Sequence, residues 1–292
     1  MKPAPFEYYA PRSVPEALAL LSEHGYDAKV LAGGQSLVPM MNFRLVQPAV
    51  VVDINNIPEL SGIQGDKNGL RLGAMVRHAQ VEKAPIVKER APLIYETMPQ
   101  IATAQIRNRG TIGGSLSHAD PSAELVVVTT ALDAKFKIQN QKGERVVSAR
   151  EFFVGLLMTV MEPEDLLIEV EIPDLPPRTG WSLKEVARRP HDFALVGVTA
   201  LLTLDRKGRC EKASLVYLSA GDGPVSAPEA AALLEGEVIN GDLIAAAAEK
   251  AAEDEIDPGS DIHATAEFRR HLANVLTRRA LEEAHQRAGG GK

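Results

Sequence analysis

The sequence predicts an α+β protein in which an N-terminal region of strands and helices precedes a C-terminal antiparallel sheet with packed helices. Two short segments, residues 32–36 (AGGQS) and 111–115 (TIGGS), each follow an apolar stretch and pair two adjacent glycines with polar side chains. A proline-rich stretch, residues 173–180 (PDLPPRTG), is the best candidate for a linker. After it come three segments with strand character and then apolar residues at helical spacing.

Local signals predict the N-terminal elements one by one. Ser13 and Glu16 form a capping box at the start of a helix, and Gly25 ends that helix. Three prolines divide residues 78–104, which otherwise have a helical pattern. Strands are expected, in chain order, at residues 29–32, 50–54, 70–74, 126–138 and 166–172.

The C-terminal elements follow the linker. Strands are expected at residues 181–187, 195–205 and 213–219. Ser226 and Glu229 predict a second capping box, for a helix that ends at Gly236. A further helix begins near Leu243, and residues 289–292 should be disordered. The long final helix presents an apolar face that should pack on the sheet, with Phe268, Leu272, Val275 and Leu276.

Composition excludes several classes of protein. The 292 residues are 45% apolar and 24% charged, which is ordinary for a soluble globular chain of two or three domains. A net charge of −7 argues against a nucleic-acid surface or a polybasic membrane patch. No apolar run approaches the roughly 20 residues that span a bilayer, and the N-terminus lacks the apolar core of a signal peptide, so a cytoplasmic location is expected.

The single cysteine, Cys210, restricts the redox chemistry. It excludes an intrachain disulfide and any cysteine-held iron–sulfur cluster within this polypeptide. If the protein exchanges electrons with such clusters, another chain must hold them.

The two glycine segments point to an anionic ligand. Adjacent glycines let several backbone N–H groups point into one concavity, which binds anionic oxygens without lysine or arginine. Two such segments suggest a bridged anion, and the pyrophosphate of a dinucleotide is the obvious candidate. Neither segment fits the G-x-G-x-x-G fingerprint, and no P-loop motif occurs. A single Gly-Gly pair would favour a plain turn, but the two pairs together favour a ligand site.

Three stretches identify a family. They are residues 30–45 (VLAGGQSLVPMMNFRL), 105–121 (QIRNRGTIGGSLSHADP) and 183–197 (LKEVARRPHDFALVG). With them the chain resembles the FAD-binding medium subunits of the molybdenum hydroxylases (the xanthine dehydrogenase family), most of all the carbon monoxide dehydrogenase members. The resemblance covers essentially the whole chain. It implies a two-part FAD-binding domain of the vanillyl-alcohol-oxidase/PCMH type over residues 1–175, with two α/β subdomains, and a C-terminal flavoprotein domain over residues 180–288, with a three-stranded antiparallel sheet plus helices.

The resemblance also implies which residues bind FAD. The two glycine segments would enclose the pyrophosphate from opposite sides. Glu124 would contact the adenosine half, although the family more often has aspartate there, and Leu167 would lie near the adenine. Lys184 would lie close to the flavin ring or its chain, and Asp192–Phe193 would form a mobile segment beside the isoalloxazine. The candidate cofactor-binding residues are Leu31, Ala32, Gly33, Gly34, Gln35, Ser36, Leu37, Ile101, Thr111, Ile112, Gly113, Gly114, Ser115, His118, Asp120, Glu124, Leu167, Lys184, Asp192 and Phe193. Neither a metal ligand set nor a catalytic residue is expected.

Simpler interpretations of several candidates stay open. The hydroxyls in the glycine segments can cap local turns, and Asp120 before Pro121 can start a turn. Arg107 and Arg109 can face an anion or a partner, or lie in a solvated loop. The Lys184 side chain can lie on the surface, with its aliphatic part covering apolar neighbours.

The resemblance implies a function in electron transfer. The chain would be the FAD-carrying subunit of a heteromeric molybdenum hydroxylase. It would accept electrons from [2Fe-2S] clusters in a small iron–sulfur subunit, after substrate hydroxylation in a large molybdopterin subunit, and pass them to an external acceptor. The complex would be a dimer of heterotrimers, cytoplasmic or at the periphery of the inner membrane. The alternatives are a free-standing flavin oxidase of the same fold and a non-catalytic nucleotide-binding scaffold subunit.

Overall fold

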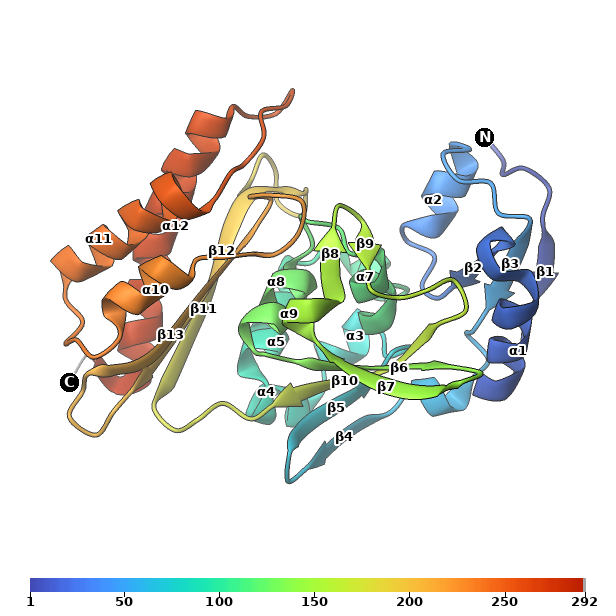
Figure 1. The fold of residues 1–292 in the computed structure, drawn as a ribbon, viewed down its shortest axis with the longest axis horizontal. Coiled ribbons are helices and arrows are strands. Elements are labelled where there is room, and N and C mark those ends of the chain that lie inside the picture. The colour runs from blue at the N-terminus through green and yellow to red at the C-terminus, as the bar shows by residue number, and fades with distance from the viewer. Residues whose placement is uncertain (291–292) are drawn as a thin grey trace.

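A small parallel sheet forms the N-terminal lobe of the structure, a computed structural model that describes residues 1–290 (Figure 1). Its strands lie in the order β1–β3–β2 and comprise β1 (Glu7–Tyr9), β2 (Ala28–Leu31) and β3 (Val50–Asp53). Helix α1 (Val14–His24) packs on β3, and the Ser13 hydroxyl accepts a hydrogen bond from the Glu16 amide at 3.4 Å. The predicted start of this helix is therefore confirmed. Because β2 and β3 run parallel, the segments that follow them begin at the same sheet edge.

A five-stranded antiparallel sheet forms the centre, in the order β4–β5–β10–β6–β7. Its strands are β4 (Ile63–Asp66), β5 (Gly69–Gly73), β6 (Lys135–Asn140), β7 (Gly143–Ser148) and β10 (Leu166–Pro173). The strands predicted at residues 70–74 and 166–172 are confirmed and pair directly with each other. A small hairpin of β8 (Phe153–Gly155) and β9 (Met158–Thr159) precedes β10.

Short helices pack around the central core. Pro85 and Pro92 each lie in the first turn of one of them, where their missing N–H and fixed φ are tolerated. The divided helical pattern predicted for residues 78–104 is therefore confirmed. These short helices are α3 (His78–Val81), α4 (Pro85–Arg90), α5 (Pro92–Thr97), α6 (Ala104–Arg107), α7 (Ile112–His118), α8 (Glu124–Ala131) and α9 (Ala149–Phe152), whereas α2 (Leu37–Asn42) lies at the N-terminal lobe (Figure 1).

A third sheet, in the order β11–β12–β13–β14, forms the C-terminal part (Figure 1). The three predicted strands are confirmed as β11 (Thr179–Ala187), β12 (Ala194–Leu204) and β13 (Cys210–Leu218), and β14 (Val225–Ser226) is an additional edge strand. The helices α10 (Pro228–Leu234), α11 (Gly241–Lys250) and α12 (Ala266–His285) follow, and α10 and α12 pack on this sheet. Helices α5 and α8 of the central part also contact the sheet, so it is covered by both parts of the chain.

The strand predicted at residues 126–138 is confirmed only from Lys135, where β6 begins, and is wrong before that, because the segment first contains most of helix α8. Its Leu125–Thr130 run is rich in β-branched residues, which favour strands. All six residues of that run are buried, and α8 contacts α5 as well as β12 and β13. A helix that is buried on every side has no polar face, so its sequence lacks the alternation of apolar and polar residues every three to four positions that identifies a helix.

The capping box predicted at Ser226 is also wrong. Ala227 is the N-cap of α10, and Ser226 belongs to β14. The Glu255 carboxylate instead accepts hydrogen bonds from the amides of Glu229 and Ala230, at 2.8 and 2.7 Å. A distant acidic side chain thus replaces the local cap and stabilises the helix N-terminus.

The end of the chain differs in part from expectation. Leu276 lies on the buried face of α12, but Phe268 is 47% exposed. A π-helical turn over Gln286–Gly290 follows α12 and is interrupted at Gly289, where φ is +96°. Gly291 and Lys292 of the tail expected to be disordered lie outside the described residues. Within the described chain, no helix combines the length and apolar character needed to cross a membrane.

Candidate functional site

The first glycine segment is a loop between β2 and α2. Gly34 adopts a φ of +74°, a left-handed conformation that other L-residues rarely adopt. The Gln35 side chain donates a hydrogen bond to the Gly33 carbonyl at 3.0 Å, and the Val38 amide donates to the Gly34 carbonyl at 3.2 Å. These bonds fix the loop through two of its carbonyl oxygens and use none of the backbone N–H groups of residues 33–37.

The amide groups of this loop have the property that an anion site needs. Within the described residues, the backbone N–H groups of residues 33–37 donate no hydrogen bond. Such a run of unused donors is costly unless water or a ligand accepts from them. Five consecutive amides in one short bend are therefore available to an acceptor such as an anion.

The second glycine segment is not a loop, contrary to expectation. Thr111 is the N-cap of α7, and its hydroxyl accepts a hydrogen bond from the Gly114 amide at 3.0 Å. The Ile112 amide donates to the Val76 carbonyl and the Gly113 amide to the Ala74 carbonyl, at 3.0 and 2.8 Å. The Ser115 amide donates to the Thr111 carbonyl, so the amides of residues 112–115 are all used and do not form a second concavity of free donors.

The glycines of the second segment serve close packing instead. A Cβ on Gly113 would lie 2.5 Å from the Ala74 Cβ and 2.8 Å from the Ala74 carbonyl oxygen. A Cβ on Gly114 would lie 2.6 Å from the Thr111 hydroxyl oxygen. The hydroxyls of Thr111 and Ser115 remain candidates for contact with a ligand.

The fold brings the two glycine segments together. A Cβ on Gly33 would lie 2.4 Å from the Arg109 carbonyl oxygen and 2.8 Å from the Gly110 Cα. A Cβ on Gly114 would lie 3.5 Å from the Ala32 Cβ. Residues 76 positions or more apart in sequence thus meet at one site, an arrangement that can hold a ligand from two sides.

Ile101 lies in a turn that Arg107 fixes. Arg107 is 8% exposed and donates hydrogen bonds to the carbonyls of Ile101 and Ala102, at 3.1 and 2.9 Å. Its other nitrogens form a bidentate pair with Glu82, at 3.0 and 3.2 Å. Arg107 therefore faces neither solvent nor a free anion site. Ala102, at a φ of +43°, is held in the left-handed region by these bonds.

Two acidic side chains lie near each other between the central part and the C-terminal sheet. Burial, with a smaller contribution from the charge of Glu124, raises the pKa of the Glu185 carboxyl to about 8. Burial also raises the pKa of Glu124 to about 7, with a contribution from Asp120. The Glu185 Oε2 atom is buried and has no hydrogen-bond partner in the described residues. Glu185 was not among the predicted site residues.

We expect this pair to make stability depend on pH. A carboxyl whose pKa is raised by folding contributes stability below its unfolded value of 4.5, and that stability is lost as the pH rises through about 8. The free energy of unfolding should therefore fall between pH 5 and pH 8.5 by roughly 1–3 kcal/mol more in the wild type than in Glu185→Gln. Urea unfolding of both chains across this range tests the prediction, and parallel curves would contradict it.

The C-terminal candidates lie apart from one another. Lys184 forms an ion pair with Glu283, on the side of β11 that α12 covers. Asp192 and Phe193 lie in the loop between β11 and β12, and Phe193 is 75% exposed. An exposed aromatic side chain in a connecting loop is free to cover a ligand or a partner.

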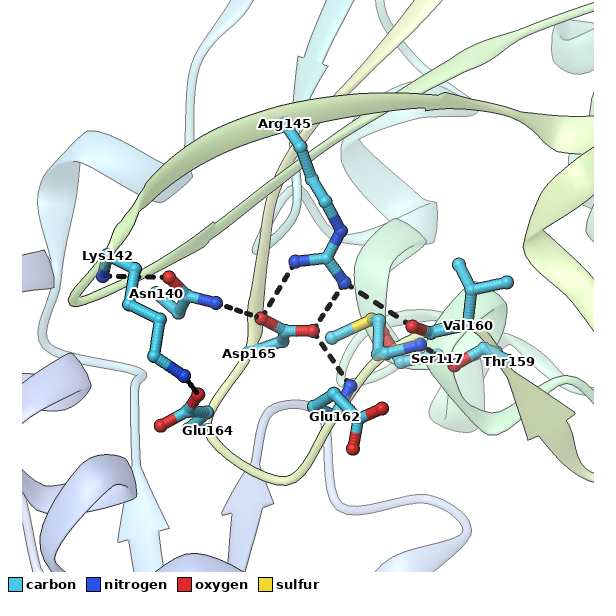
Figure 2. Close-up of polar contacts among 10 residues, drawn as sticks. Ser117, Asn140, Lys142, Arg145, Thr159, Val160, Glu162, Glu164 and Asp165 are labelled. Carbon is cyan, nitrogen blue, oxygen red and sulfur yellow. Dashed lines mark hydrogen bonds and ion pairs between the residues drawn. The ribbon is translucent and has the colours of Figure 1, made fainter.

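Leu167 is buried in the central core, at the start of β10. The loop before this strand is fixed by Asp165, whose side chain is fully buried (Figure 2). Asp165 accepts hydrogen bonds from Arg145 at 2.9 and 2.5 Å, from Asn140 at 2.8 Å and from the Glu162 amide at 2.7 Å. Burial alone would raise the pKa of Asp165, but these hydrogen bonds hold it below its ordinary value.

The remaining candidates have local roles in the structure. Asp120 accepts a hydrogen bond from the Ser122 amide at 2.8 Å, so it starts a turn, as its simpler interpretation predicts. His118 is half-buried in the last turn of α7. In the described part of the chain, no group of three His, Cys, Asp or Glu residues could hold a metal ion. Cys210 is buried in β13.

Two polar residues beside the glycine segments, Asn55 and Arg77, are absent from the sequence prediction. Asn55 donates a hydrogen bond to the Ala32 carbonyl at 2.9 Å, and Arg77 bonds to both Asn55 and the Arg109 carbonyl. A polar pair directly after a predicted strand, Asn55-Asn56, was the one available signal for this cluster.

Comparison with known proteins gives one consistent result. Residues 4–175 match the family described as the FAD binding domain in molybdopterin dehydrogenase, and residues 181–284 match the CO dehydrogenase flavoprotein C-terminal domain. The chain is 40% identical to the 6-hydroxypseudooxynicotine dehydrogenase complex subunit alpha of Paenarthrobacter nicotinovorans, over 99% of this chain and 97% of that one. It is also 40% identical to the caffeine dehydrogenase subunit beta of Pseudomonas sp. strain CBB1, over 98% and 97%. The solved structure of carbon monoxide dehydrogenase from Hydrogenophaga pseudoflava, in a form without the Mo-pyranopterin moiety, matches with a TM-score of 0.95 at 36% identity, over 98% and 99% of the two chains.

Proposed function

Because the chain belongs to the family of FAD-binding medium subunits of molybdopterin dehydrogenases, we propose that it carries FAD as the electron-transfer subunit of a heteromeric molybdenum hydroxylase. It is a subunit of an oxidoreductase. The proposal adds the route: electrons enter from [2Fe-2S] clusters in a small partner and leave to an external acceptor. FAD suits this position because it exchanges electrons both singly and in pairs.

The residues of this chain fit the cofactor. The pyrophosphate of FAD is an anion with several oxygens, and the amides of residues 33–37 are unused donors in one bend. Gly33 leaves room for no side chain against the Arg109 carbonyl, so the two glycine segments can approach closely. The unused amides are the single observation that carries the proposal.

We assign roles to the remaining candidates on the basis of family membership. The loop residues 31–37 hold the pyrophosphate through backbone amides, and Thr111 and Ser115 add hydroxyl donors. Ile101, His118, Asp120, Glu124 and Leu167 line the site, and Lys184, Asp192 and Phe193 lie toward the flavin ring. The FAD-binding domain spans residues 1–175 and the C-terminal domain residues 180–288.

The partners follow from the chemistry that this chain lacks. One cysteine cannot hold an iron–sulfur cluster, so the clusters belong to a small subunit and the molybdenum centre to a large subunit. The complex is a dimer of heterotrimers in the cytoplasm. The substrate is set in the large subunit, and the relatives named above differ in their substrates.

Purification of the full chain with and without partners tests the proposal. The isolated chain should bind about one FAD and oxidise no N-heterocycle, aldehyde or carbon monoxide. Co-expressed with the large and small subunits from neighbouring genes, it should support reduction of an artificial acceptor. Substrate turnover by the isolated chain would instead support the flavin oxidase, and a chain that binds no flavin would overturn the proposal.

A further inference from the structure

A series of hydrogen-bonded side chains connects the N-terminal lobe to the residues just before the second glycine segment. Asn55 lies just after β3, at the sheet edge where β2 also ends. Its side-chain nitrogen donates to the Ala32 carbonyl at 2.9 Å, one residue before Gly33. Asn55 therefore fixes the backbone at the start of the first glycine segment.

Arg77 extends this series of hydrogen bonds to Arg109, just before the second glycine segment. One nitrogen of its guanidinium donates to the Asn55 side-chain oxygen and another to the Arg109 carbonyl. Arg109 is the residue whose carbonyl oxygen lies against Gly33, where a Cβ would come within 2.4 Å. A single guanidinium thus contacts the Arg109 carbonyl directly and reaches the Ala32 carbonyl through the Asn55 side chain. A planar fork of donors is suited to bridge two acceptors in this way.

Both side chains are held in place by their own neighbours. The Asn55 amide donates to Asp53 at 2.9 Å, and the Tyr8 hydroxyl donates to the other oxygen of Asp53 at 2.5 Å. The backbone around Arg77 is fixed because the Ile112 amide donates to the Val76 carbonyl at 3.0 Å. The chain of contacts is therefore anchored at both ends.

We propose that Asn55 and Arg77 form a clamp that sets the distance between the two glycine segments and so positions the amides of residues 33–37 for the FAD pyrophosphate. The inference rests on the proposed function, since it assigns positioning residues to the same site. Neither side chain needs to touch the cofactor. Removal of either should widen or loosen the concavity and leave the strands around it intact.

The test measures FAD binding by the full chain for Arg77→Ala, Asn55→Ala and the double variant, with Arg209→Ala as the control. Arg209 pairs with Asp205 in the turn between β12 and β13, away from the glycine segments in sequence and in the fold. Each single variant should bind FAD about ten-fold or more weakly, and the visible circular dichroism of the bound flavin should change. The double variant should bind FAD no more weakly than the weaker-binding single variant, because the loss of either residue already interrupts the same series of hydrogen bonds. The control should bind as the wild type does.

Chemical rescue separates positioning from a general loss of structure. Millimolar ethylguanidinium should restore FAD affinity to Arg77→Ala, since it can occupy the place of the missing fork, whereas it would not restore the affinity of a merely destabilised chain. Arg77→Lys should bind FAD with intermediate affinity, because an ammonium group lacks the planar fork.

The outcomes distinguish the clamp from the proposed function. If the wild type binds FAD and Arg77→Ala binds it equally well, the clamp is overturned and the proposed function stands. If the wild type binds no FAD, both fall. If Arg77→Ala does not fold, Asn55→Ala and Arg77→Lys decide in its place, and wild-type affinity in both overturns the clamp.

Discussion

Gly33→Val should abolish FAD retention while the C-terminal sheet stays folded. A Cβ at this position would lie 2.4 Å from the Arg109 carbonyl oxygen and 2.8 Å from the Gly110 Cα. Both are backbone atoms, so the two glycine segments must move apart. Overpacking of this kind costs about 1–3 kcal/mol or more, and at a binding site it weakens affinity by about 100-fold.

The measurement is the FAD content of the purified chain, followed by a fluorescence titration of the apo form. Gly259→Val is the matched control, because no atom lies within 4 Å of a Cβ at that position. The control should keep its flavin. Full FAD occupancy in Gly33→Val would contradict the assignment of the first glycine segment.

Gly180→Val should destabilise the C-terminal domain more than any other glycine substitution. Gly180 lies near the start of β11, against α12, and its Cβ would lie 1.8 Å from the Ala284 carbonyl oxygen and 2.6 Å from the Ala288 amide nitrogen. Helix α12 would have to leave the sheet. The expected loss is about 3 kcal/mol or more of unfolding free energy, at the upper end of the overpacking range.

Urea unfolding followed by the fluorescence of Trp181, the only tryptophan, reports on this region directly. Gly223→Val serves as the control, since a Cβ there meets no atom within 4 Å. A midpoint for Gly180→Val within error of the control would show that α12 does not pack on β11 as described.

The fold was predictable where local signals agree with long-range packing. The strands on either side of the linker have either alternating apolar and polar residues or continuous apolar runs, and prolines stand in the first turns of the short helices. Helix α8 was missed because burial on every side removed its polar face. The cap of α10 was missed because the carboxylate of Glu255, 26 residues away from Glu229, supplies it. Neither the burial of α8 nor the capping of α10 by Glu255 can be predicted from the residues next to these helices in the sequence.

The candidate site was predictable only in part, for a similar reason. The two Gly-Gly pairs have nearly the same local sequence, yet one leaves its amides unused and the other does not. The difference is made by the carbonyls of Ala74 and Val76, which reach the second segment from a distant strand end. Asn55, Arg77 and Glu185 were missed because their neighbours come from other elements.

A crystal structure of the full chain grown with FAD tests the central claim most directly. The account predicts that pyrophosphate oxygens lie about 3 Å from backbone nitrogens of residues 33–37. A pyrophosphate bound elsewhere, with these amides still facing solvent, would contradict it.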